Sequence, residues 1–295
     1  MKQASNDFAR TRYAFESVDD VRVFYRESGD PQRRAVVLLH GFPSSSHMYR
    51  EVLDNLGDEF YLIAPDYPGF GNSDFPDPKD YKYTFDNLAK TTEALLEQKG
   101  ITEWVLAIQD YGAPVGFRLA TKYPKRVKGL IVMNGNAYEE GFDPDSSAPV
   151  RSYWESHTEE KEAMIADQLL SLQGVKWQYT QGTRNPDGIN PDNWTLDFAW
   201  LQRPGQRQMQ LDLFYDYRTN VELYPEWQAF LKESQPPTLI AWGERDPIFI
   251  AAGAEAYRRH LESPEFHLFP TGHFVLEEDA PRILPLIRSF LLKIG

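Results

Sequence analysis

The chain has 295 residues and carries 31 Lys and Arg against 44 Asp and Glu, a formal net charge of −13 at pH 7. An acidic chain without a long basic run is a poor partner for nucleic acid or an anionic membrane surface. No cysteine is present, which excludes disulfides, thiolate metal sites and a cysteine nucleophile. Residues 1–20 are polar and lack the apolar segment of a secretory signal, and no apolar run is long enough to span a bilayer. These features predict a cytoplasmic protein.

Apolar runs and helical patterns alternate along the first part of the chain. Residues 35–39 are continuously apolar, as expected of a strand buried on both faces of a parallel sheet. In chain order the sequence predicts strands over 21–26, 35–39, 60–64, 104–108 and 127–133, and helices over 84–98 and 113–122. Strands that alternate with helices at this spacing predict an α/β fold with a mostly parallel, doubly wound sheet.

The alternation stops in the middle of the chain. Residues 137–226 are polar and rich in aromatic side chains, with helical patterns over 159–171 and 204–217. The sheet pattern then resumes, with strands at 238–242 and 265–269 and helices at 251–260 and 281–293. We therefore predict one sheet domain, formed by residues 1–136 and 227–295, that is interrupted by a helical cap over residues 137–226.

Polar motifs follow four of the predicted strands, at the sheet edge where open α/β folds bind their ligands. Asp110 lies in a strand–tight turn–helix segment, the position that a serine nucleophile usually takes. Asp246 and His273 follow the last two strands, so the chain order is nucleophile, acid, histidine. The segment His40-Gly41-Phe42-Pro43 follows strand 35–39. No Gly-x-Ser-x-Gly motif occurs, which disfavours a serine esterase.

The chain resembles α/β-hydrolase-fold enzymes of the epoxide hydrolase and haloalkane dehalogenase group. The resemblance extends over nearly the whole length, through residues 40–43, 66–73, 109–112, 242–247 and 272–274. It implies Asp110 as nucleophile, His273 as base and Asp246 as the residue that orients the base. It also implies that the backbone N–H groups of Phe42 and Tyr111 form an oxyanion hole, and that a helical cap follows the sixth strand.

An aspartate nucleophile suits displacement at a saturated carbon. Its carboxylate is ionised at neutral pH and attacks without a base, which gives an alkyl–enzyme ester. His273 would then activate a water molecule that attacks the carboxyl carbon of Asp110, and the oxyanion hole would stabilise the tetrahedral charge.

The leaving group distinguishes the two activities. An epoxide oxygen needs a proton, typically from cap tyrosines, whereas a halide accepts N–H donors, typically from Trp or Asn. Tyr217, within residues 216–220, is similar to the tyrosine that polarises an epoxide. Tyr153 and Trp154 both lie where a second donor is expected, and the sequence leaves open which of them faces the site. We expect His40, Pro43 and Trp154 to line the substrate pocket.

Differences from the dehalogenase sequences favour an epoxide substrate. Haloalkane dehalogenases usually carry Trp at the position of Tyr111, and haloacetate dehalogenases carry arginines at the positions of Tyr111 and Pro114. Gln109, in contrast, is more typical of dehalogenases than of epoxide hydrolases. We predict an epoxide hydrolase that forms vicinal diols. A haloalkane or haloacid dehalogenase is the alternative, and a non-catalytic ligand receptor on the same scaffold is the third hypothesis.

The predicted partner is a small apolar organic substrate, and the protein is either a monomer or a homodimer. No pair of histidines has metal-ligand spacing, and no Walker loop or Gly-x-Gly-x-x-Gly motif occurs. The sequence therefore predicts neither a metal nor a cofactor.

Overall fold

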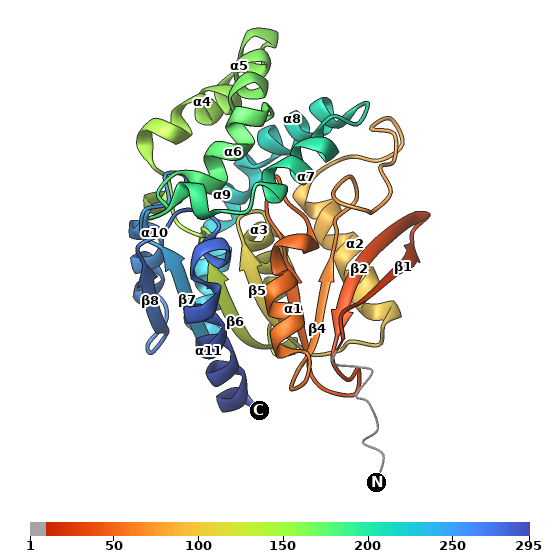
Figure 1. The fold of residues 1–295 in the computed structure, drawn as a ribbon, viewed down its shortest axis with the longest axis vertical. Helices are drawn as coiled ribbons and strands as arrows, with labels where there is room; N and C mark the ends of the chain where they lie inside the picture. The colour runs from red at the N-terminus through yellow and green to blue at the C-terminus, as the bar shows by residue number, and fades with distance from the viewer. Residues whose placement is uncertain (1–9) are drawn as a thin grey trace.

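The computed structural model describes residues 10–295, so the first nine residues of the expected core segment 1–136 and of the polar N-terminus lie outside the described residues. One sheet has the strand order β1-β2-β4-β3-β5-β6-β7-β8 (Figure 1). The strands are β1 (Arg12–Val18), β2 (Val21–Ser28), β3 (Ala35–Leu39), β4 (Tyr61–Pro65), β5 (Trp104–Gln109), β6 (Val127–Met133), β7 (Thr238–Gly243) and β8 (Glu265–Phe269). β1 pairs antiparallel with β2, and β2 pairs antiparallel with β4. The remaining pairs, from β4 and β3 across to β8, are parallel. The predicted α/β fold with a mostly parallel sheet is confirmed.

Helices cover both faces of this sheet. In Figure 1, α1 (Arg50–Leu56) and α11 (Val275–Ile294) lie in front of it, and α2 (Phe85–Gln98) and α3 (Gly112–Lys122) lie behind it. The central strands β3, β4, β5 and β7 are buried over their whole length because they are covered from both sides. The carboxyl ends of the parallel strands therefore meet at one rigid edge.

A group of helices between β6 and β7 lies over this edge of the sheet (Figure 1). We name α4 to α8 the inserted helices: α4 (Pro144–Glu155), α5 (Glu159–Leu169), α6 (Leu172–Thr180), α7 (Asp192–Leu201) and α8 (Gln206–Asp216). They lie within the expected cap segment 137–226. α9 (Arg218–Ser234) continues past the end of that segment and packs against α3, and α10 (Ala251–Ala256) follows β7. Short 3-10 helices occupy Ser46–Tyr49, Pro124–Arg126, Glu139–Gly141, Pro186–Gly188 and Tyr257–Arg259.

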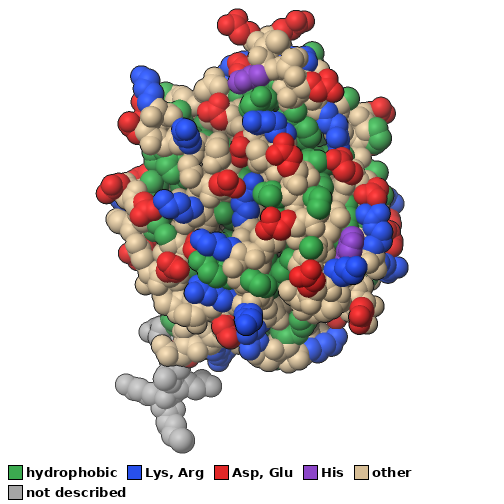
Figure 2. Space-filling model, turned by 180° about the vertical axis from the view of Figure 1, so that it is seen from behind, with side chains coloured by type: hydrophobic (Ala, Val, Ile, Leu, Met, Phe, Trp, Pro, Cys, Tyr) green, Lys and Arg blue, Asp and Glu red, His purple; other side chains and the backbone are tan. Residues whose placement is uncertain are grey.

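The charged side chains do not segregate on the face that Figure 2 shows. Lys and Arg are interspersed there with Asp and Glu, so neither sign forms a continuous patch. Within residues 10–295, no helix combines the length and the apolar character needed to cross a membrane.

A buried carboxyl group lies between the inserted helices and the sheet domain. The Tyr179 hydroxyl donates a 2.5 Å hydrogen bond to Oδ2 of Asp197, and both side chains are buried. Burial raises the pKa of Asp197 to about 7, and the nearby carboxylates of Glu277 and Asp66 add to this rise. The hydrogen bond from Tyr179 lowers the pKa but does not offset the rise. The folded chain thus keeps a proton that the unfolded chain releases near its ordinary pKa of about 4. Folding stability contributed by this group therefore falls as the pH rises from about 4 to about 7.

We expect the variant Asp197→Asn to be more stable than the native chain, and by more at pH 8 than at pH 5. The amide oxygen can still accept from Tyr179, but it carries no charge to desolvate. The gain in the free energy of unfolding should grow by about 3 kcal/mol between these pH values, which urea unfolding measures. Asp192→Asn, at an exposed position of the same helix, is the control. An equal gain at both pH values would contradict the raised pKa.

Candidate active site

Asp110 lies in a tight turn between β5 and α3, at the carboxyl edge of the sheet. Its φ is +47°, in the left-handed region that Asp tolerates better than bulkier residues. Two glycines let the backbone approach this turn closely. A Cβ on Gly112 would lie 2.0 Å from the Leu39 carbonyl oxygen, and a Cβ on Gly41 would lie 2.4 Å from Cβ of Asp110. The loop after β3 is thereby pressed against the Asp110 side chain.

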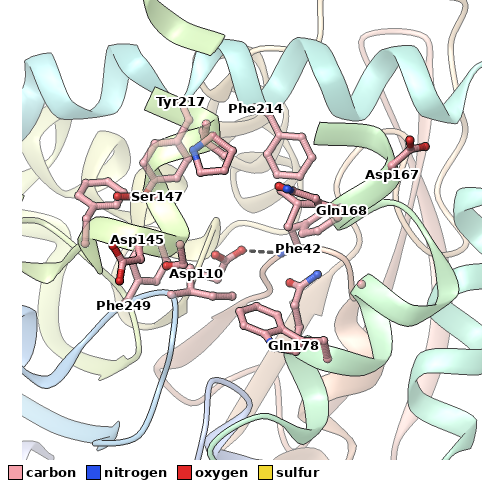
Figure 3. Close-up of a pocket in the computed structure, with 18 of the residues that line it drawn as sticks. Phe42, Asp110, Asp145, Ser147, Asp167, Gln168, Gln178, Phe214, Tyr217 and Phe249 are labelled. Atoms are coloured by element: carbon pink, nitrogen blue, oxygen red, sulfur yellow. Dashed lines mark hydrogen bonds between the residues drawn. The ribbon is translucent and has the colours of Figure 1, made fainter. Parts of the chain in front are cut away.

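Backbone N–H groups hold the Asp110 carboxylate. The N–H of Phe42 donates to Oδ1 at 2.6 Å, drawn as the dashed line in Figure 3, and the N–H of Tyr111 also donates to the carboxylate. Burial raises the pKa of Asp110, while the neighbouring His273 and these two N–H groups hold the rise back. The two expected oxyanion-hole residues thus both contact the carboxylate of the expected nucleophile.

His273 lies between two carboxylates. Its Nδ1 is 2.8 Å from Oδ2 of Asp246, and its Nε2 is 3.8 Å from Oδ2 of Asp110. Burial lowers the pKa of the imidazole, but the two carboxylates outweigh burial and the pKa is raised. An ionised carboxylate can only accept a hydrogen bond, so Nδ1 of His273 carries the proton that it donates to Asp246. Nε2, on the side of Asp110, is then the nitrogen that can take up a proton.

Asn134 fixes the carboxylate of Asp246, and sequence reasoning missed it. It follows β6 directly, and its Nδ2 donates to Oδ2 of Asp246 at 2.7 Å while its Oδ1 accepts from the N–H of Gly243 at 2.9 Å. The N–H of Ile248 donates to the other oxygen of Asp246 at 2.7 Å. The only signal for Asn134 in the sequence is a polar residue directly after a buried strand.

Gln109 contacts the base nitrogen and was also missed as a site residue. Its Nε2 lies 2.9 Å from Nε2 of His273, and its side chain is buried. With the proton on Nδ1, the neutral imidazole accepts a hydrogen bond from the Gln109 amide at Nε2. Its place directly before Asp110 gave no indication of this contact, because successive strand residues usually point to opposite faces.

A cavity of about 540 Å³ opens onto Asp110, and Figure 3 shows its wall. Aromatic and other apolar side chains make up much of this wall, and Tyr217 and Phe214 reach it from the inserted helices and the start of α9. The wall includes Phe42, Asp110, Ser147, Trp154, Gln178, Phe214, Tyr217 and Phe249. The arrangement can hold a small organic molecule against the Asp110 carboxylate.

Tyr217 and Trp154 are stacked in the cavity wall, with ring centroids 5.9 Å apart. The Trp154 Nε1–H donates to the Phe214 carbonyl at 2.7 Å, so this donor is occupied. The Tyr217 hydroxyl is buried without a well-formed hydrogen bond to any residue in 10–295, although Tyr224 lies near enough to affect its pKa. Burial and the charge of Asp110 raise the pKa of Tyr217 well above its ordinary value.

Three residues expected at the site lie elsewhere. Tyr153 is buried outside the cavity, where its hydroxyl lies 2.7 Å from Nε2 of His157. The rotation of α4 about its axis places Trp154, and not Tyr153, in the cavity wall. His40 is not in the cavity wall: it links two loops, with Nδ1 3.1 Å from the Gly41 carbonyl and the Tyr67 N–H donating to Nε2 at 3.1 Å. Burial lowers the pKa of His40 to about 3, so it is neutral. Pro43 does not line the cavity either.

Within residues 10–295, no three His, Asp or Glu side chains are grouped so that they could hold a metal ion. The prediction that no metal or cofactor takes part stays a prediction.

The sequence matches a family model described as the alpha/beta hydrolase fold over residues 34–280. An uncharacterized hydrolase of Saccharomyces cerevisiae is 42% identical over 275 residues, which cover 92% of this chain and 94% of the yeast protein. A cis-3-alkyl-4-alkyloxetan-2-one decarboxylase of Shewanella oneidensis is 29% identical over 88% of this chain and 82% of its own. Epoxide hydrolase 3 of Xenopus tropicalis is 26% identical over 92% of this chain and 75% of its own.

Solved structures share the whole fold. The epoxide hydrolase CorEH superimposes with a TM-score of 0.78 at 18% identity and covers 97% of this chain and 100% of its own. The haloalkane dehalogenase DatA from Agrobacterium tumefaciens gives 0.77 at 19% identity and covers 97% of each chain. At these identities the similarity concerns the fold.

Proposed function

Because the chain belongs to the alpha/beta hydrolase fold family, we propose that it is a hydrolase in which Asp110 attacks a saturated carbon and His273 drives release of the product. The substrate is an epoxide and the product a vicinal diol. The observation that carries this choice concerns the two stacked aromatic donors in the cavity wall: the O–H of Tyr217 is available, whereas the indole N–H of Trp154 already binds a carbonyl.

The first step is attack by Oδ2 of Asp110, because Oδ1 is held by the N–H of Phe42. A bond forms between Oδ2 and an epoxide carbon while the carbon–oxygen bond of the ring breaks. The Tyr217 hydroxyl gives its proton to the leaving oxygen, and the tyrosinate later regains a proton from water. The inserted helices and the start of α9, which supply Trp154 and Tyr217, thus act as the expected cap.

The second step is hydrolysis of the ester on Asp110. Nε2 of His273 takes a proton from water, the water oxygen attacks the carboxyl carbon, and the charge on Oδ1 is stabilised by the N–H groups of Phe42 and Tyr111. When the intermediate collapses, His273 returns the proton to the departing diol oxygen and Asp110 is left as the neutral acid. Its proton neutralises the hydroxide that formed when Tyr217 regained a proton from water, which restores the Asp110 carboxylate. Asp246, oriented by Asn134, stabilises the imidazolium that forms in between.

In the structure, Gln109 is hydrogen-bonded to Nε2 of His273, the nitrogen that acts as the base in the second step. Its amide donates to Nε2 of His273, so the hydrolytic water has to take the place of this amide before it can give up a proton. The contact also keeps the ring neutral at Nε2, the state that the second step requires.

The names of the relatives suggest three substrate classes to test: an epoxide, a haloalkane and an oxetan-2-one. The purified protein is incubated with styrene oxide, 1-bromobutane and a cis-3,4-dialkyloxetan-2-one, and the diol, bromide and carbon dioxide that they would yield are measured. A p-nitrophenyl ester, followed by nitrophenolate release, tests for ester hydrolysis. We expect diol from the epoxide at a rate well above those of the other products. Bromide release as the fastest reaction would make the protein a dehalogenase, and carbon dioxide release would make it a decarboxylase like the Shewanella relative.

The pH profile follows from the shifted groups. Asp110 has to be ionised and His273 neutral, and the pKa values of both are raised, so we expect activity to fall as the pH is lowered. The pKa of Tyr217 lies well above 10, so no alkaline loss is expected up to about pH 10. Alkylation removes the negative charge of Asp110, which contributes to the raised pKa of His273 in the free enzyme. The pKa of His273 in the alkyl–enzyme, seen in the pH dependence of kcat, should therefore be lower than in the free enzyme. An alkaline limb between pH 7 and 9 would contradict Tyr217 as the acid.

A further inference from the structure

Gln178 is a buried amide in the cavity wall with no partner in the protein. It lies on α6 and is 2% exposed, and its Nε2 is buried without a hydrogen-bond partner among residues 10–295. Figure 3 shows its amide directed into the same cavity as the Asp110 carboxylate. Each of the other buried glutamines forms a hydrogen bond through its amide nitrogen: Gln109 with His273, Gln206 with the Gly69 carbonyl, and Gln210 with Gln206.

An amide buried without a partner is costly. Leaving such a group unpaired costs about 1–3 kcal/mol relative to a paired one, so the site favours a bound molecule that pairs with it. Gln168 and Gln173 also line the cavity, but both are exposed and water can bind their amides. Gln178 is therefore the amide in this wall whose hydrogen bonds depend on what fills the cavity.

The charges of the wall restrict that molecule. No Lys or Arg lines the cavity among the described residues, while the carboxylates of Asp110, Asp145 and Asp167 do. A carboxylate or phosphate on the substrate would be repelled by these groups and would lack a counter-charge. The polar group that pairs with Gln178 is therefore uncharged.

We propose that Gln178 determines substrate specificity by donating a hydrogen bond to a carbonyl oxygen of a neutral epoxide. The substrate then has an apolar body, an epoxide held at Asp110 and an uncharged carbonyl group held at Gln178. The inference rests on the proposed function, because it assumes that an epoxide occupies the cavity.

Matched substrate pairs test this proposal. Glycidyl butyrate and butyl glycidyl ether differ only in a C=O that replaces a CH₂, and homologues of this pair vary the distance between carbonyl and epoxide. Diol formation is measured for each pair, and the quantity compared is the ratio of kcat/KM for the carbonyl substrate to that for its partner. In the native protein we expect a ratio of about ten for the best-spaced pair, as one hydrogen bond gives.

In Gln178→Leu the ratio should fall to about one, mainly through KM of the carbonyl substrate. Gln98→Leu, the same change at an exposed position of α2 outside the cavity, should keep the ratio. Since Gln178 makes no bond within the protein, thermal unfolding of Gln178→Leu should show no loss of stability, whereas a merely structural amide would lose some. A ratio near one in the native protein for every pair, or a ratio that survives in Gln178→Leu, overturns the inference alone. Absence of diol from all epoxides overturns the proposed function and the inference with it.

Discussion

His273→Gln is expected to stop turnover at the covalent stage, so that an enzyme heavier by the mass of one epoxide accumulates. Alkylation needs the ionised Asp110 and the Tyr217 proton, and neither depends on Nε2 of His273 as a base. Hydrolysis does depend on it, and loss of a general base slows such a step by about two to four orders of magnitude. Intact-mass spectrometry after addition of styrene oxide measures the adduct, and peptide mapping should place it on Asp110.

Two further variants make this result specific. His273→Gln combined with Asp110→Asn should give no adduct, since the amide is not a nucleophile. His267→Gln changes a partly exposed histidine on β8 whose contact is Glu265, and it should retain turnover. Full turnover in His273→Gln would rule out His273 as the base. Loss of both turnover and adduct, in a variant that unfolds at the native temperature, would show that His273 is also needed for alkylation.

The parallel strands were predictable because their burial leaves a strong pattern in the sequence. Strands covered on both faces need apolar residues at every position, and 35–39 and 104–108 read as continuous apolar runs. Strand β1 lacks that signal. It lies at the sheet edge, where its side chains alternate in exposure and Tyr13 and Phe15 face outward, so no apolar run marks it.

The last helix shows how packing overrides a local rule. The sequence predicts a helix over 281–293 that begins at Pro281, and proline suits a first helical turn. In the structure α11 begins at Val275 and continues through Pro281 and Pro285. An interior proline costs about 3 kcal/mol through its missing N–H and its ring. Burial of the apolar face of α11, which includes Ile283 and Ile287, offsets that cost.

The site was predictable to the extent that the sheet determines it. Asp110, Asp246 and His273 each follow a parallel strand, and the carboxyl ends of such strands meet at one edge. The choice between Tyr153 and Trp154 depends instead on the rotation of α4 about its axis. That rotation is set by contacts with the next helix, α5, and with α8, which lies much further along the chain, so no local pattern reveals it.

Tyr217→Phe is expected to lower kcat/KM for styrene oxide by about two orders of magnitude, the usual loss when one transition-state donor is removed. The ring can keep its stacking with Trp154, and the lost hydroxyl makes no well-formed hydrogen bond, so the free energy of unfolding should change little. Because ring opening is slowed, the double variant with His273→Gln should form the adduct about a hundredfold more slowly than His273→Gln alone. Rapid-quench sampling with intact-mass detection measures this rate.

Tyr153→Phe is the matched control, since it removes the hydroxyl of the residue before Trp154, which contacts His157 outside the cavity. We expect it to leave styrene oxide turnover close to that of the native protein, because the hydroxyl that it removes does not face the cavity. The leaving group gives a second comparison: bromide departs without a proton, so any alkylation by 1-bromobutane should be unaffected by Tyr217→Phe. Equal losses with epoxide and bromide would assign Tyr217 a role in holding the substrate. A large loss in Tyr153→Phe alone would move the acid to Tyr153 and require α4 to rotate during the reaction.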